Sequence, residues 1–153
     1  MPENGYMAKN TGFKRPESVL ILVYTELGHV LMLERNNPQG FWQSVTGSLE
    51  WGEASEHAAV RELFEETGLK DRPLVNCNME NSFPILPEWR HHYAPDVKEN
   101  REYIYSLRLS APCKIQLNPN EHNKYEWLEY RVAIQKCSSW TNRQAIEQIV
   151  KPG

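Results

Sequence analysis

The stretch GSLEWGEASEHAAVRELFEETGL, residues 47–69, contains the pattern that decides the fold. Apolar positions in its second half recur with the 3.6-residue period of a helix that has one apolar face, namely Val60, Leu63, Phe64 and Thr67. We therefore predict a helix over residues 54–67. It should end at Gly68, because glycine readily adopts the left-handed conformation that closes a helix.

The same helix carries three glutamates, Glu62, Glu65 and Glu66, on the side roughly opposite to the predicted apolar face. Like charges at this spacing repel one another, at a cost of about 0.2–0.5 kcal/mol for each pair. Three interpretations compete: a solvated acidic surface, a calcium loop, or a divalent-cation site at which a phosphate reacts. The D-x-D-x-D-G spacing of a calcium loop is absent. Carboxylate oxygens are ligands that Mg²⁺ prefers, so the cluster is a candidate metal site.

Length and composition indicate one ordinary domain, with 153 residues of which 40% are hydrophobic and 24% charged. A formal net charge of −3 argues against a nucleic-acid-binding face, which would be basic. The N-terminus has no apolar signal-like run, and the longest apolar stretch, residues 19–24, is too short to span a bilayer. The three widely spaced cysteines form no metal motif. We therefore expect a cytoplasmic protein without a membrane partner.

The remaining segments mostly have the pattern of short strands. Apolar or alternating runs predict strands at 19–24, 29–35, 41–47, 101–109 and 124–130, and a final amphipathic helix is predicted at 140–150. Residues 1–13 are polar and are expected to form a flexible leader before one domain over 14–153. Residues 81–97, rich in proline and aromatic residues, are expected to form a long functional loop. Many strands with few helices predict a mixed sheet flanked by helices, in the α/β (α+β) class.

The spacing around the acidic helix is highly specific. Gly47, Glu53 and the run of residues 61–69 match G-x5-E-x7-R-E-U-x-E-E-x-G-U, with U aliphatic, at every defined position. This pattern resembles the Nudix box, whose family hydrolyses nucleoside diphosphates linked to another group. The resemblance implies an α/β/α sandwich in which the box forms a loop, a helix and a loop. It also implies that Glu62, Glu65 and Glu66 bind Mg²⁺, or Mn²⁺, with the carbonyl of Gly47 as a further ligand.

The resemblance also implies roles for charged residues around the metal. Arg61 is expected to orient a glutamate through a charge-assisted hydrogen bond, and Glu65, one turn further on, is the geometric candidate. Glu53 is expected to tie down the loop rather than bind the metal. Many Nudix enzymes take the catalytic base or an extra metal ligand from a glutamate outside the box, and Glu121 is our candidate for this role.

Segments outside the box resemble a narrower group of Nudix enzymes, those that remove pyrophosphate from 7,8-dihydroneopterin triphosphate in folate synthesis. These segments are residues 14–24, 30–53, 91–95, 121–128 and 138–148. Such a ligand needs cations for its triphosphate tail and an apolar slot with polar edges for its flat head. The candidate substrate contacts are Lys14 and Arg35 for the tail, with Thr46, Phe83, Ile85 and Ser139 for the rest of the substrate.

Two other functions stay open. The first is a general nucleotide pyrophosphohydrolase that acts on dATP or on oxidised purine triphosphates. The second is a non-catalytic module that binds a nucleotide without cleaving it, which the complete set of box glutamates disfavours. In each case the expected partner is a small triphosphate or nucleotide, with no nucleic acid. A monomer is expected because no hydrophobic stripe demands a dimer.

Overall fold

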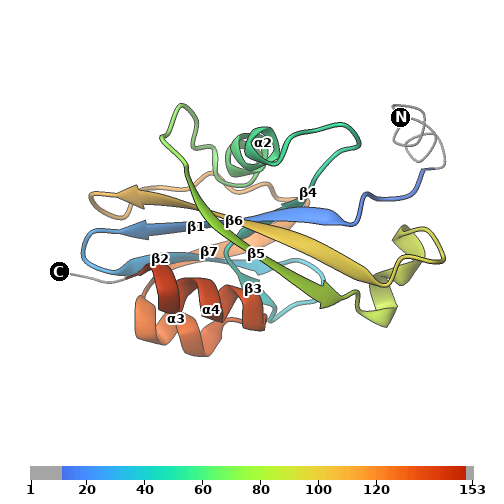
Figure 1. Cartoon of the computed structure of the whole chain (residues 1–153). Helices are drawn as coiled ribbons and strands as arrows, with labels where there is room; N and C mark the ends of the chain where they lie inside the picture. The colour runs from blue at the N-terminus through green and yellow to red at the C-terminus, as the bar shows by residue number, and fades with distance from the viewer. Residues whose placement is uncertain (1–11, 151–153) are drawn as a thin grey trace.

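The computed structural model describes residues 12–150, and in it seven strands form one mixed sheet between helices (Figure 1). The strands are β1 (Glu17–Thr25), β2 (His29–Arg35), β3 (Trp42–Gln43), β4 (Val45–Ser48), β5 (Val75–Pro84), β6 (Glu99–Leu109) and β7 (His122–Glu129). The helices are α2 (Ser55–Thr67), the 3-10 helix η1 (Pro87–His92), α3 (Tyr130–Lys136) and α4 (Trp140–Ile149). The predicted leader, residues 1–13, falls largely on residues 1–11, which lie outside the described residues.

Strand β1 is central to the sheet. It pairs in parallel with β6 along its whole length, from Glu17 opposite Arg101 to Thr25 opposite Leu109. Its other edge is shared, because β4 pairs with residues 18–21 and β2 pairs near Tyr24, both antiparallel. Strand β2 also pairs with β3 and β7, and β5 pairs with the outer edge of β6. Strand β4 is thus held beside the first half of β1.

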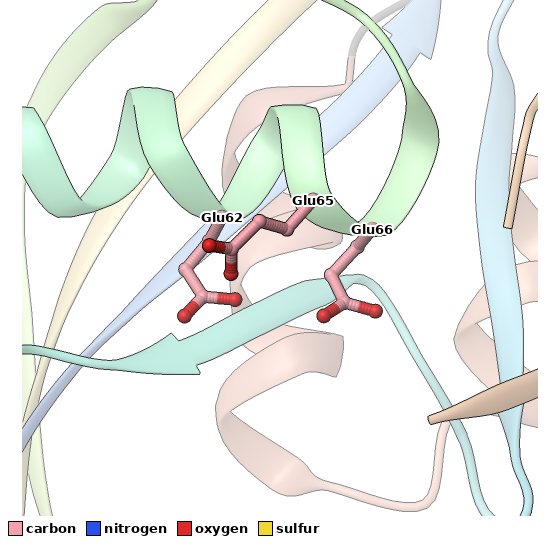
Figure 2. Close-up of side chains that lie close together, drawn as sticks. All are labelled: Glu62, Glu65 and Glu66. Carbon is pink, nitrogen blue, oxygen red and sulfur yellow. The ribbon is translucent and has the colours of Figure 1, made fainter. Parts of the chain in front are cut away.

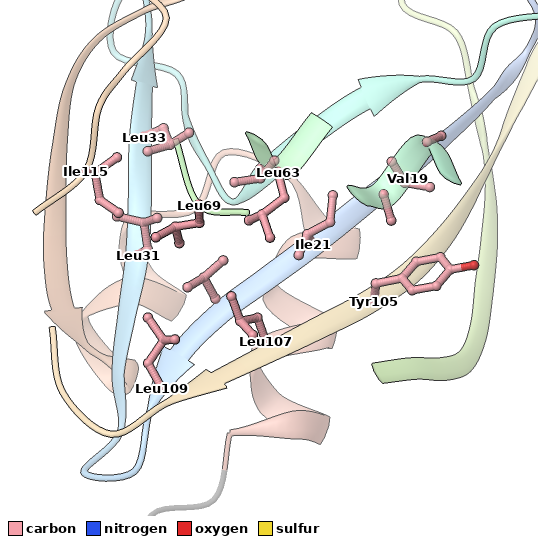
Figure 3. Packing of buried hydrophobic residues seen from close by; sticks show 14 of the residues in the cluster. Val19, Ile21, Leu31, Leu33, Leu63, Leu69, Tyr105, Leu107, Leu109 and Ile115 are labelled. Carbon is pink, nitrogen blue, oxygen red and sulfur yellow. The ribbon is translucent and has the colours of Figure 1, made fainter. Parts of the chain in front are cut away.

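Helices cover both faces of this sheet, so the predicted α/β/α sandwich is confirmed. Helix α2 lies on one face, and α3 with α4 lies on the other (Figure 1). Ile21, Leu33 and Leu63 belong to the apolar core under α2 (Figure 3). Ile104 and Ile146 belong to the second core, under α3 and α4. Each such fully buried side chain stabilises the fold by about 1.5–3 kcal/mol.

The predicted apolar face of α2 is wrong in two of its four positions. Val60 is 53% exposed and Phe64 is 50% exposed, whereas Leu63 and Thr67 are buried as predicted. The helix instead rests on its small residues, among them the fully buried Ala59. Its acidic side therefore adjoins the buried face and does not lie opposite to it. The helix does end at Gly68, whose φ of 77° is left-handed.

Three other segments differ from the sequence predictions. The strand expected at 41–47 is two short strands, interrupted at Ser44, whose N–H donates to Oδ1 of Asn142 on α4 at 2.7 Å. The loop expected at 81–97 starts inside β5, an edge strand whose polar sequence hides its alternation. Helix α3 lies outside the segments to which the sequence assigned a helix. The strands expected at 19–24, 29–35, 101–109 and 124–130 and the helix at 140–150 are confirmed, with ends that differ by at most two residues. Within residues 12–150, no helix is both long and apolar enough to cross a membrane.

Candidate active site

One cavity of about 1140 Å³ brings α2, β4, β6, η1 and the start of α4 to a common space. Every residue nominated from the sequence lies on its wall. For the metal and the reaction these are Gly47, Arg61, Glu62, Glu65, Glu66 and Glu121. For the substrate these are Lys14, Arg35, Thr46, Phe83, Ile85 and Ser139. Because residues far apart in the sequence share this wall, the cavity is the candidate active site.

Three carboxylates on α2 form what we call the acidic cluster: Glu62, Glu65 and Glu66. One oxygen from each lies within 4.8 Å of the others. Figure 2 shows the three side chains extending from the same side of α2. Glu62 and Glu66 are buried, at 8% and 5% exposure, whereas Glu65 is open to solvent. An oxygen-only set of this charge and spacing fits a hard divalent cation such as Mg²⁺.

Gly47 on β4 makes room for the acidic cluster. A Cβ atom at this position would lie 1.9 Å from Cδ of Glu62, far inside van der Waals contact. The carboxylate of Glu62 therefore rests directly against the backbone of β4. Only glycine allows this approach, which explains in physical terms why the box begins with this residue.

Arg61 ties the loop before α2 to the acidic cluster. Its Nε and Nη2 donate to the two oxygens of Glu53, both at 2.9 Å, in a bidentate pair. Its Nη1 donates to Glu62 at 2.8 Å and to Glu65 at 3.2 Å. Glu53 also accepts from the backbone N–H of Glu50 at 3.0 Å. The expected contact with Glu65 is present, but the guanidinium is committed mainly to Glu53, which does hold the loop.

The electrostatics of the acidic cluster favour an added positive charge. Burial raises the pKa of Glu62 to about 7, and the neighbouring carboxylates of Glu65 and Glu66 add to the rise, whereas Arg61 opposes it. The pKa of Glu53 is lowered, chiefly by its hydrogen bonds from Arg61. A divalent cation beside Glu62 would favour its ionised form, since an opposite charge lowers the pKa of a carboxyl group.

A buried histidine orients Glu66. Nδ1 of His122 lies 3.0 Å from Oε1 of Glu66, and Nε2 lies 3.3 Å from Nε2 of Gln43. A carboxylate only accepts, so Nδ1 carries the proton and Nε2 accepts from the Gln43 amide. Sequence analysis missed His122, although it follows the nominated Glu121 directly, because nothing local marks it as buried.

A third buried carboxyl group lies on β6, in what we call the Glu102 region: Ser18, Asn100, Glu102 and Thr141. All four residues line the cavity. Glu102 is 5% exposed, and its burial raises its pKa to about 7, opposed only by a hydrogen bond with Thr141. Nδ2 of Asn100 donates to Oγ of Ser18 at 2.8 Å. Sequence analysis missed this region because Glu102 lies in an ordinary alternating strand.

The rim of the cavity combines cations with aromatic rings. The guanidinium of Arg35 lies 5.3 Å from the ring centre of Trp89 and 5.9 Å from that of Phe41. Nζ of Lys14 lies 5.9 Å from the ring centre of Tyr93. These are cation–π distances, so the rings hold positive charge at the entrance. Phe41, Trp89 and Tyr93 also line the cavity, and sequence analysis assigned them no role in it.

Residues 14–149 match the family model of the NUDIX domain. The chain belongs to the Nudix family. This Nudix hydrolase is 42% identical to the dihydroneopterin triphosphate diphosphatase of Escherichia coli, over 93% of this chain and 97% of that protein. It is 33% identical to the Haemophilus influenzae protein of the same name, over 89% of this chain and 88% of that one. The solved structure of the E. coli dihydroneopterin triphosphate pyrophosphohydrolase superimposes with a TM-score of 0.84 over 90% of this chain and 97% of that chain.

Proposed function

We propose that this Nudix hydrolase converts 7,8-dihydroneopterin triphosphate to the monophosphate and pyrophosphate, with Mg²⁺ as its metal. The observation that carries the proposal is that one cavity is lined both by the acidic cluster and by apolar and aromatic residues suited to a flat polar head. The extent of the likeness to the two dihydroneopterin triphosphate diphosphatases supports this choice of substrate.

In this proposal Glu62, Glu65 and Glu66 hold Mg²⁺, or Mn²⁺, with the carbonyl of Gly47 and the carboxylate of Glu121 as further ligands. A cation bound there would neutralise the charge of the polyphosphate and would lower the pKa of a water molecule in the site. The orientation of Glu66 by His122 and the packing of Glu62 against Gly47 support this set, because rigid ligands give a defined site.

The reaction needs a base, and Glu121 is the candidate. It is exposed on the loop before β7, lines the cavity and directly precedes the buried His122. Its carboxylate would take the proton of the attacking water. The water oxygen then forms a bond to phosphorus in line with the leaving bridge oxygen, and that P–O bond breaks to release pyrophosphate. Arg61 fixes the position of the loop relative to the acidic cluster through its four contacts with carboxylate oxygens.

The substrate contacts follow from the two halves of the ligand. Lys14 and Arg35 on the rim would attract the triphosphate tail, since both are cations at the cavity mouth. Phe83, near the end of β5, and the buried Ile85, just after this strand, would pack against the pterin ring. Thr46 and Ser139 would offer hydroxyl groups to the substrate. Ser139 also caps α4 through the N–H of Asn142.

A substrate panel tests the proposal. The enzyme would be assayed at equal concentrations of 7,8-dihydroneopterin triphosphate, dATP and an oxidised purine triphosphate, with Mg²⁺ or with EDTA, and pyrophosphate and phosphate would be measured separately. We expect the highest kcat/KM for the pterin, pyrophosphate as the first product and no turnover in EDTA. Orthophosphate as the first product, or equal rates without divalent metal, would refute the chemistry. A preference for purines would favour the general nucleotide pyrophosphohydrolase instead.

The proposed setting is a monomeric enzyme that acts in the cytoplasm on a small triphosphate, with no nucleic-acid or membrane partner. The modest negative charge and the free state of Cys77, Cys113 and Cys137 support this setting. Gel filtration combined with light scattering tests the oligomeric state directly.

A further inference from the structure

A buried carboxylate oxygen faces the cavity without a partner. Among the side chains of residues 12–150, only Nδ1 of His29 and Oε1 of Glu102 are buried polar atoms that lack a hydrogen bond. An unsatisfied buried acceptor of this kind costs about 1–3 kcal/mol. Glu102 lines the cavity and His29 does not, so a ligand is able to satisfy this oxygen.

The neighbouring polar groups are already occupied, which leaves Oε1 of Glu102 as the free acceptor. Asn142 donates to Oγ of Ser44 and accepts from the Ser44 N–H. Asn100 donates to Ser18, and the hydroxyl of Thr141 lies 2.9 Å from that of Ser139. Alternation along β6 places Glu102 on the same face as Ile104, which packs in the core under α3 and α4. The carboxyl group is thus fixed at the floor of the cavity, on a strand rather than on a mobile loop.

We propose that Glu102 determines specificity for the head group by accepting two hydrogen bonds from its 2-amino group and the adjacent ring N–H. This inference rests on the proposed function, since the head group is that of the proposed substrate. The 2-amino-4-oxo pyrimidine ring of dihydroneopterin presents these two donors side by side, and a carboxylate presents two acceptors at matching separation. Guanine carries the same pair of donors. Adenine presents an acceptor nitrogen beside one amino group, so it would leave one carboxylate oxygen opposed by a lone pair.

One substitution at Glu102 tests this proposal. Glu102→Gln keeps the shape of the side chain and replaces one acceptor by a donor. The matched control is Glu80→Gln on β5, an exposed residue on the strand beside β6 that does not line the cavity. The comparison uses kcat/KM at pH 8 with Mg²⁺ for dihydroneopterin triphosphate, dGTP and dATP.

We expect Glu102→Gln to lower kcat/KM for the pterin and for dGTP by about 10- to 100-fold, the usual range for loss of one bidentate contact. The value for dATP should not fall, because the glutamine amide presents the donor and acceptor that complement the ring nitrogen and amino group of adenine. Glu80→Gln should match the unmodified enzyme on all three substrates. A purely structural role for Glu102 predicts equal losses on all three. That result, or an unchanged value for the pterin and dGTP, would overturn the proposal.

A binding measurement separates this inference from the proposed reaction. Unphosphorylated 7,8-dihydroneopterin carries the head without the tail, so its calorimetric Kd in EDTA reports on the head contacts alone. We expect Glu102→Gln to raise this Kd by about 10- to 100-fold, and an unchanged Kd would contradict the role of Glu102. If the unmodified enzyme shows no preference for the pterin triphosphate, the proposed substrate fails, and the ratio of dGTP to dATP turnover then decides the role of Glu102.

Discussion

Glu62 and Glu102 are buried carboxyl groups that line the same cavity, but their neighbours differ. Burial raises the pKa of Glu62 on α2 and of Glu102 on β6 to about 7. Glu62 lies 2.8 Å from a nitrogen of Arg61 and beside two further carboxylates. Glu102 has no charged partner of this kind: a hydrogen bond with Thr141 is all that opposes the rise in its pKa, and one of its oxygens is unpaired. Both groups are buried, so their neighbours make the difference: the charges around Glu62 suit the proposed cation, and the lack of them around Glu102 suits the proposed N–H donors.

Loss of a carboxylate from the acidic cluster is the change with the largest expected effect. Glu66→Gln keeps the side-chain shape and can still accept from His122, but it removes one charge from the cation site. We expect kcat to fall by about 10³-fold or more, because several kcal/mol of charge stabilisation depend on the metal. Steady-state kinetics with Mg²⁺ measure this loss.

The control for this change is Glu56→Gln, an exposed glutamate in the first turn of the same helix. It should leave kcat unchanged, and circular dichroism should show the same fold for both variants. Near-normal turnover by Glu66→Gln would mean that the metal is held elsewhere, and the contrast between the two carboxyl groups would then lose its basis.

The two carboxyl groups also differ in how far the sequence predicts them. The acidic cluster is visible because its members are three and four residues apart on one helix, and because Gly47 and Gly68 stand at fixed distances from it. Glu102 has no such local signal, since its burial depends on the pairing of β6 with β1 and on the arrival of α4 from the far end of the chain. The role of His122 could not be predicted for the same reason, since its contact with Glu66 joins distant segments of the chain.

The fold shows the same division between local and long-range information. Apolar strands such as β1 and β2 were predicted because their own residues carry the pattern. The polar edge strand β5 was missed, because an edge strand is specified by its partner more than by its composition. The exposure of Val60 and Phe64 was also missed, since the close approach of Gly47 to Glu62 fixes which side of α2 meets the sheet.

The second prediction concerns stability and uses the pH dependence of Glu102. Its folded pKa of about 7 lies above the ordinary value of 4.5, so its ionisation opposes folding. This cost is absent near pH 4, appears as the pH rises from 4.5 to 7, and is complete at pH 8. Because one pKa unit corresponds to 1.36 kcal/mol, Glu102→Gln should raise the free energy of unfolding at pH 8 by about 3 kcal/mol.

Urea titrations in EDTA at pH 4 and pH 8 measure this difference without any contribution from metal. The stabilities of the two proteins should be nearly equal at pH 4, which separates an effect of charge from an effect of packing. Glu80→Gln should show no such change with pH. A destabilisation of the same size at both pH values would mean that Glu102 is held by contacts that glutamine cannot replace.

A third prediction tests the packing that positions Glu62. Gly47→Ala would place a methyl group 1.9 Å from Cδ of Glu62, so the carboxylate must move. We expect kcat/KM to fall by about 100-fold, because a displacement of about 1 Å in a catalytic site has an effect of this size. The Mg²⁺ concentration for half-maximal activity should also rise. Unchanged kinetics would show that Glu62 tolerates another position.

The smallest expected effect concerns His122, which hydrogen-bonds to Glu66. His122→Ala removes the hydrogen bond that orients Glu66, and loss of such an outer contact usually weakens metal binding or activity by about 10- to 100-fold. We expect the lower end, since Glu66 stays anchored on α2. The Mg²⁺ concentration for half-maximal activity should rise while KM for the triphosphate at saturating Mg²⁺ stays unchanged.

His122→Asn, which keeps a donor near Nδ1, should recover most of the loss. Failure of asparagine to rescue, together with an unchanged Mg²⁺ dependence in both variants, would assign His122 to packing and leave Glu66 oriented by the helix alone.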